Sequence, residues 1–279
     1  MPAERSIRLD NRVTLAYAEQ GDPAGVPVVL LHGFADSWRS WELVLPHLLP
    51  SLHVLALTQR GHGDSGRPPS GYGIVDMAGD LAAFLDALAL RSAILVGHSM
   101  GSAVAQRLAI DHPERVAGLV LVGAAPSLRA SEASRAYWTT ALAALSDPVD
   151  AAWMRRMIER SLARPVPPEF VDSAVRESLK VPARVWRAVF EARWRLEGDF
   201  EAELSAICAP TLVVWGDRDA RYPRHDQDRL VAAMPNARLL VYECCGHNLH
   251  WEQPERVAAD VAAFVATTHR APASGLWLG

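Results

Sequence analysis

Short apolar runs, separated by helical stretches, recur along most of the chain. Six of these runs are rich in Val, Ile and Leu and occupy residues 28–31, 53–57, 93–96, 119–122, 211–214 and 239–242. They are continuously apolar instead of alternating, which is typical of strands covered by helices on both faces of a parallel sheet. Two more polar segments, at 6–9 and 13–17, predict edge strands ahead of this sheet.

The stretches between the runs predict helices at 41–49, 75–88, 102–110, 226–233 and 254–265. Strands that alternate with helices in this way indicate an α/β fold, with a mainly parallel sheet flanked by helices. One interval, 127–205, breaks the alternation, because it contains no good strand and only helical patches, at 133–144, 149–162, 169–179 and 182–196. Its prolines can each end one helix or open the next. We therefore interpret 127–205 as a helical cap inserted after strand 6 into a core made of residues 1–126 and 206–279.

The cap carries four tryptophans, Trp138, Trp153, Trp186 and Trp194. Their side chains could line a substrate cavity, but packing of the cap onto the sheet is the favoured interpretation for each. Acidic and basic residues balance across the cap, so its arginines predict solvated helix faces and not an anion site.

Composition and charge argue against several classes of function. Half of the residues are hydrophobic and 22% are charged, a mixture that can bury a large core and argues against disorder. A net charge of -4 leaves no basic excess for nucleic acid or for an anionic membrane. No apolar run is long enough to span a membrane, and the polar amino terminus does not resemble a signal peptide. The three cysteines, Cys208, Cys244 and Cys245, have no metal-binding spacing, so we expect free thiols, no metal site and a cytoplasmic location.

The strongest chemical motif is the pentapeptide Gly97-His98-Ser99-Met100-Gly101. It directly follows the apolar run 93–96 and directly precedes the helical stretch that begins at Ser102. A serine on such a sharp strand-to-helix turn projects its hydroxyl above the sheet, and the two glycines allow the chain to fold tightly around it. We therefore predict that Ser99 is a catalytic nucleophile.

A serine nucleophile needs a base, and the base needs an acid that fixes its tautomer. His247 follows the run 239–242, and Asp219 follows the run 211–214, with Asp217 as a rival two residues earlier. The order serine, aspartate, histidine along the chain is the one expected for this arrangement. The sequence thus predicts a triad of Ser99, Asp219 and His247.

Several further motifs agree with one family. The segments are His32-Gly33-Phe34, the glycine-rich run 60–66, the acid loop 216–219, Gly246-His247, and Glu252-Gln253-Pro254. Together they resemble the α/β-hydrolase superfamily, in its branch of capped serine esterases, haloperoxidases and epoxide-hydrolase-like proteins, over residues 6–266. The resemblance implies a mainly parallel eight-stranded sheet, and it favours Asp219 over Asp217 because the acid stands fourth in the acid loop. It also implies an oxyanion hole made by the backbone N–H groups of Phe34 and Met100.

Other polar residues near these motifs are predicted to have structural roles. The resemblance implies that His32 and His98 shape their loops. We expect His250 to begin or cap a helical region. Asp36 and Asp64 are typical of loop aspartates that satisfy local backbone groups.

Two departures from the family pattern limit the chemistry. Epoxide hydrolases and haloalkane dehalogenases of this fold carry an aspartate where this chain has Ser99, and epoxide hydrolases usually carry proline where it has Ala35. Both departures argue against these reactions.

The expected reaction is hydrolysis of a small to medium carboxylic ester or lactone through an acyl-enzyme, without metal or organic cofactor. Carbon–carbon bond hydrolysis, peracid formation with halide oxidation, and thioester or amide cleavage remain open with the same triad. A hydrolase-fold ligand receptor is the alternative of a different class. The expected partner is a small-molecule substrate, and the sequence does not predict an oligomeric state.

Overall fold

The computed structural model describes residues 2–126, 132–194 and 200–270. One eight-stranded sheet runs through it, in the order β1-β2-β4-β3-β5-β6-β7-β8. The strands are β1 (Ala3–Arg8), β2 (Thr14–Gly21), β3 (Val26–Leu31), β4 (Leu52–Leu57), β5 (Ala93–His98), β6 (Val116–Val122), β7 (Thr211–Gly216) and β8 (Ala237–Tyr242). Strands β3 to β8 are parallel to one another, whereas β1 and β2 pair antiparallel at one edge. The predicted mainly parallel sheet, with two polar strands at its edge, is confirmed.

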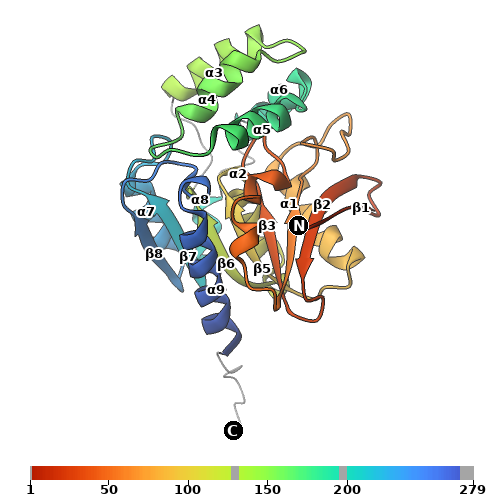
Figure 1. Cartoon of the computed structure of the whole chain (residues 1–279), viewed down its shortest axis with the longest axis vertical. Helices are drawn as coiled ribbons and strands as arrows, with labels where there is room; N and C mark the ends of the chain where they lie inside the picture. Colours follow the sequence, from red (N-terminus) through yellow and green to blue (C-terminus); the bar gives the residue numbers. More distant parts are fainter. Residues whose placement is uncertain (1, 127–131, 195–199, 271–279) are drawn as a thin grey trace.

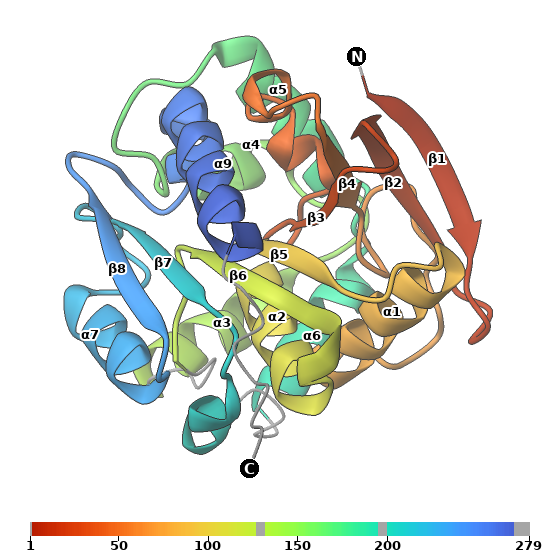
Figure 2. The same ribbon diagram turned by 90° about the horizontal axis from the view of Figure 1, so that it is seen from below.

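Helices cover both faces of this sheet. On one face lie α1 (Ile74–Ala87), α2 (Met100–Asp111) and α7 (Arg224–Ala233), and on the other lies α9 (Pro254–Arg270) (Figure 2). Alternate residues of β3 accordingly belong to two separate cores, with Val29 on the α1 and α2 side and Val28 on the α9 side. Burial on both faces explains why the central strands carry apolar residues at several consecutive positions.

The described residues between β6 and β7 include four α-helices: α3 (Glu132–Ala144), α4 (Ala151–Glu159), α5 (Pro168–Leu179) and α6 (Ala183–Trp194). They stand together over one end of the sheet (Figure 1), and their bounds agree closely with the helical patches that the sequence predicts. Lys180, at the end of α5, pairs with Asp64 at 3.0 Å and accepts a hydrogen bond at its carbonyl from Arg67. Asp64 therefore has a longer-range partner than the local backbone contact predicted for it. Residues 127–131 and 195–199, at the ends of the predicted cap, are outside the described residues.

The prediction of a helix over residues 41–49 is wrong. Two short 3-10 helices, η1 (Trp38–Trp41) and η2 (Leu45–His47), occupy this region. Pro46 has no N–H group to donate and disfavours helical geometry in the residue before it, so the apolar spacing cannot become a continuous α-helix. The other short elements are η3 (Pro113–Arg115), η4 (Glu201–Ala206) and α8 (Leu249–Glu252). None of the described helices has the length and apolar character needed to cross a membrane.

Candidate active site

Ser99 occupies a strained turn between β5 and α2. Its backbone has φ 50° and ψ -113°, a left-handed φ that a residue with a side chain rarely adopts. A Cβ at Gly97 would lie 2.4 Å from the carbonyl oxygen of Gly101, and a Cβ at Gly101 would lie 2.4 Å from that of Leu31. Glycine is therefore required on both sides of the serine, as the motif predicts, and the turn directs Ser99 into a cavity.

Asp219 and His247 form a buried pair beside this turn. Asp219 Oδ2 lies 2.8 Å from His247 Nδ1, and Asp219 Oδ1 accepts the N–H groups of Arg221 and Tyr222 at 2.7 and 3.2 Å. Burial by itself would raise the pKa of Asp219, but His247 and the two N–H donors outweigh burial and lower it. An ionised Asp219 holds the proton of His247 on Nδ1 and leaves Nε2 as a proton acceptor.

The rival aspartate and two of the rival histidines have other partners. The Asp217 carboxylate is partly exposed, 3.9 Å from Arg218. His32 Nδ1 donates to the carbonyl of Gly33 at 2.6 Å, and its Nε2 accepts from the backbone N–H of Gln59 at 3.0 Å. His98 Nε2 lies 3.1 Å from the carbonyl oxygen of His247. These contacts agree with the loop-shaping roles expected for His32 and His98.

His250 lies inside α8 and is fully buried. Its Nε2 contacts the hydroxyl of Ser40 at 3.0 Å, and its ring lies 4.2 Å from that of His98 between ring centres. Burial, first, and then the nearby His247 hold its pKa well below the usual range, so the ring is neutral. His250 thus supports the wall behind His247 and does not line the cavity.

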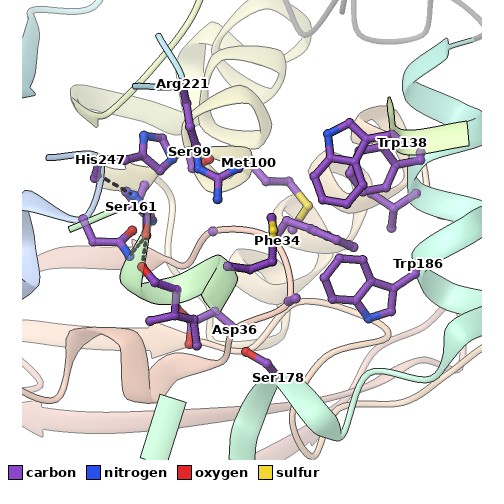
Figure 3. A pocket seen from close by; sticks show the side chains of 18 of the residues that line it. Phe34, Asp36, Ser99, Met100, Trp138, Ser161, Ser178, Trp186, Arg221 and His247 are labelled. Atoms are coloured by element: carbon purple, nitrogen blue, oxygen red, sulfur yellow. Dashed lines mark hydrogen bonds between the residues drawn. The ribbon is translucent and has the colours of Figure 1, made fainter. Parts of the chain in front are cut away.

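A cavity of about 150 Å³ brings the predicted site residues together. Ser99 and His247 line one side of it, with Phe34 and Met100 nearby (Figure 3). The hydrogen bonds of the described residues do not include one between the Ser99 hydroxyl and His247, and such catalytic bonds are often long before substrate binds. Each of these four residues follows the carboxyl end of a parallel strand, so the sheet itself gathers them at one edge.

Two main-chain donors point to an anion-stabilising function for this edge. Met100 is the first residue of α2, where the N–H group has no partner within the helix. The N–H groups of Phe34 and Met100 make no hydrogen bond to another described residue. Free N–H groups at the start of a helix favour negative charge nearby.

The tryptophans of α3–α6 divide between two roles. Trp138 and Trp186 line the cavity, and both also pack against other aromatic rings, with Trp138 4.4 Å from Phe190 between ring centres. Trp153 packs on Trp186 at 5.5 Å and does not line the cavity. The favoured prediction of packing alone is thus incomplete for Trp138 and Trp186. The side chain of Trp194 is outside the described residues.

The polar residues of the cavity wall that sequence reasoning missed include Asp36, Ser178 and Arg221. Asp36 Oδ1 does accept the N–H of Ser37 at 2.9 Å, as a local loop role predicts, but the residue also lines the cavity. Burial raises the pKa of Asp36 to about 7, and the charge of Glu177 adds to this rise. Hydrogen bonds from Ser40 and Ser37 lower the pKa and offset the rise only in part. The signal that could have found Asp36 and Arg221 is their position on loops that follow β3 and β7, next to the predicted site residues.

Comparisons with known proteins identify the family of the fold. Residues 26–254 match the family model described as the alpha/beta hydrolase fold. The chain is 33% identical to 2-hydroxymuconate semialdehyde hydrolase of Pseudomonas sp. (strain CF600), over 90% of both chains. Among solved structures, the esterase RhEst1 from Rhodococcus sp. ECU1013 superposes with a TM-score of 0.81 and 30% identity, covering 95% of this chain and 99% of the other. A thermophilic esterase from Thermogutta terrifontis superposes with a TM-score of 0.85 and 25% identity, over 96% and 99%.

The chain therefore belongs to the alpha/beta hydrolase family, which confirms the resemblance expected from its motifs. Its relatives include esterases and 2-hydroxymuconate semialdehyde hydrolase, so hydrolase is the class of enzyme that they support.

Proposed function

We propose that this protein is a serine hydrolase that cleaves a small to medium carboxylic ester or lactone through an acyl-enzyme. One observation carries the proposal: the strained Ser99 opens into the same cavity as His247, which is paired with the buried Asp219. The proposal assigns Ser99 as nucleophile, His247 as base and Asp219 as the acid that orients it.

The proposed reaction has two steps. His247 Nε2 takes the proton of the Ser99 hydroxyl while the oxygen attacks the substrate carbonyl, and the same nitrogen then protonates the leaving alcohol. Water, deprotonated by His247, attacks the resulting acyl-enzyme and releases the acid. Asp219 stabilises the imidazolium that forms in both steps.

The free N–H groups of Phe34 and Met100 support an oxyanion hole. In the proposed mechanism they donate to the negative oxygen of the tetrahedral intermediate, where the loss of one donor typically costs about 3 kcal/mol of barrier.

The cavity itself supports a small to medium substrate. A cavity of roughly this volume can hold a molecule the size of benzene, and Phe34, Trp138 and Trp186 contribute aromatic rings to its wall. We propose that residues 127–205 act as a cap over the substrate, because α4 and α6 contribute Met154 and Trp186 to the cavity wall. Trp186 lies across the cavity from Ser99 in Figure 3.

Free thiols fit a reducing compartment. Cys208, Cys244 and Cys245 are unpaired in the structure, and the adjacent Cys244 and Cys245 differ, the first exposed and the second buried. We therefore retain a cytoplasmic location as part of the proposal.

The deciding experiment measures turnover of p-nitrophenyl acetate and butyrate by the wild type and by Ser99→Ala, with a fluorophosphonate label located by mass spectrometry. We expect label on Ser99 and a fall in kcat of about 10⁶-fold in the variant. Ser102→Ala is the matched control, because the Ser102 hydroxyl donates to the Ser99 carbonyl at 2.6 Å and does not line the cavity. Absence of label together with equal rates for wild type and Ser99→Ala would overturn the assignment.

A second candidate is hydrolysis of a carbon–carbon bond. It is favoured by the 33% identity to 2-hydroxymuconate semialdehyde hydrolase over 90% of the chain. A substrate panel that contains both esters and a vinylogous diketone separates the two activities. Inert esters with a cleaved diketone would replace the ester proposal by this one. Slow single turnover, together with ligand-dependent binding of a protein partner, would instead favour a hydrolase-fold ligand receptor.

A further inference from the structure

Arg221 places a positive charge in the wall of the cavity. It is the only arginine or lysine among the described residues that line it, and it lies in the loop between β7 and α7. Its N–H donates to Asp219 Oδ1 at 2.7 Å, so the carboxylate that orients His247 also holds the backbone of Arg221 in place. Figure 3 shows the guanidinium directed into the cavity. The position of this charge is therefore tied to the catalytic pair.

The guanidinium has no acidic partner within the described residues. Neither a salt bridge nor a side-chain hydrogen bond joins it to another described group. By contrast, the buried Arg60 pairs with Asp80, and Arg107 pairs with Asp111 and Glu203. The carboxylate of Asp219, its neighbour in sequence, is already occupied by His247 and two N–H groups.

Asp36 carries the one carboxyl group among the described residues that line the cavity, and its charge does not cancel that of Arg221. It lies on the opposite side of the cavity in Figure 3, and its Oδ1 accepts the N–H of Ser37. Because burial raises its pKa to about 7, a large fraction of this carboxyl group is uncharged near neutral pH. The cavity thus presents an uncompensated cation to its contents.

An arginine in this setting recognises a carboxylate better than an arginine in open water does. The aromatic walls formed by Phe34, Trp138 and Trp186 exclude part of the solvent, which strengthens the attraction between opposite charges. A guanidinium can also bind both oxygens of a carboxylate at once. The charge of Arg221 also acts at the reacting end of the cavity. The pKa of His98, the residue before Ser99, is lowered first by burial, then by the charges of His250 and His247, and further by the charge of Arg221.

We propose that Arg221 binds a carboxylate of the substrate, so that the preferred substrate is an ester that carries a free carboxylate, such as the monoester of a short dicarboxylic acid. This inference rests on the proposed esterase function and adds a substrate class to it. The carboxylate can belong to the acyl group or to the leaving alcohol, and the guanidinium would recognise it in either place.

Two pairs of substrates separate these placements. The first compares 4-nitrophenyl hemiglutarate with 4-nitrophenyl hexanoate, which is neutral and similar in length, after subtraction of spontaneous hydrolysis. The second compares 4-carboxyphenyl butyrate with its methyl ester, so that the charge lies on the leaving group. We expect wild-type kcat/KM to favour the charged member of one pair by tenfold or more.

Variants in the loop between β7 and α7 test the role of Arg221. In Arg221→Gln the preference for the charged ester should fall by roughly 10- to 100-fold, the usual effect of removing a hydrogen-bonded charge. Arg221→Lys should restore part of it, because lysine keeps the charge without the two-pronged geometry. Arg218→Gln is the matched control: Arg218 belongs to the same loop, its side chain is 68% exposed, and it does not line the cavity. Its preference should equal that of the wild type.

A binding measurement keeps this inference separate from the proposed function. Titration of glutarate into Ser99→Ala and into the double variant Ser99→Ala/Arg221→Gln, followed by calorimetry, needs no turnover. A tenfold or greater loss of affinity in the double variant supports the carboxylate site even if every ester proves inert, in which case only the esterase proposal fails. Ester turnover with equal preferences in wild type and Arg221→Gln, or equal glutarate affinities, would overturn the role of Arg221.

Discussion

The two walls of the cavity are built in different ways. The sheet wall, made of residues on the loops after β3, β5, β7 and β8, is held by main-chain contacts such as the N–H of Ser99 on the carbonyl of Val122, at 2.9 Å. The helix wall, made of cavity residues from α3–α6, consists mainly of side chains such as Trp138, Met154 and Trp186. A main chain fixed by a sheet can hold a reacting group within a narrow range, whereas side chains on helices can be exchanged without moving it.

The contrast teaches where each property of this enzyme resides. Changes in the sheet wall should affect the rate of the reaction or the stability of the fold, and changes in the helix wall should affect which substrate is chosen. Arg221 is the exception worth testing, because it belongs to the sheet wall and yet is proposed to select the substrate.

The sharpest test of the sheet wall is Asp219→Asn. An asparagine cannot stabilise the imidazolium and can favour the wrong tautomer of His247, so kcat should fall by about 10⁴-fold. Asp217→Asn is the matched control and should remain close to wild type, because the Asp217 carboxylate lies 3.9 Å from Arg218, whereas His247 pairs with Asp219. Equal losses in the two variants, measured with p-nitrophenyl butyrate, would mean that the acid is misassigned.

Gly101→Ala should lower the stability of the fold by distorting the turn at Ser99. The new Cβ would lie 2.4 Å from the backbone oxygen of Leu31, which cannot move without disturbing β3, and overpacking of this kind costs ~3 kcal/mol. Gly79→Ala, on the open face of α1, meets nothing within 4 Å and should instead stabilise the protein by about 0.5 kcal/mol. Urea unfolding of both variants measures the difference, and similar stabilities would show that the turn is not tightly packed.

Asp36→Asn should change how stability depends on pH. Because the folded pKa of about 7 is higher than the ordinary value of 3.8 for an aspartate, the folded state binds the extra proton, and its stability falls as pH rises from about 4 through 7. Asparagine lacks this titration, so the stability of the variant relative to wild type should increase by roughly 2 kcal/mol between pH 5 and pH 8. Parallel pH profiles from chemical unfolding would contradict the raised pKa.

The smallest expected effect belongs to the helix wall. Trp138→Ala removes a partly exposed ring from the cavity, so kcat/KM for p-nitrophenyl octanoate relative to acetate should rise by about tenfold, the effect typical of one or two methylene groups. Trp153→Ala is the control, since Trp153 packs behind Trp186 without lining the cavity. An unchanged ratio in Trp138→Ala would place the acyl chain elsewhere.

Much of the molecule follows from local patterns. The apolar runs predict the central strands, and helical spacing predicts α3–α6 closely, because periodic burial is recorded directly in the order of residues. The wrong prediction of a helix over residues 41–49 also has a local cause. The apolar spacing there favours a helix, but Pro46 has no N–H group to donate, and this prevents a continuous α-helix.

The sequence by itself determined the strands, the turn at Ser99, and the proximity of Asp219 and His247, because motifs at the ends of parallel strands must meet at one edge of the sheet. Only the tertiary structure decided that Trp138 and Trp186 line the cavity, that Asp36 is buried there, and that Arg221 has no acidic partner among the described residues. These three facts depend on which groups from distant parts of the chain surround each side chain, and no local pattern of residues specifies those neighbours.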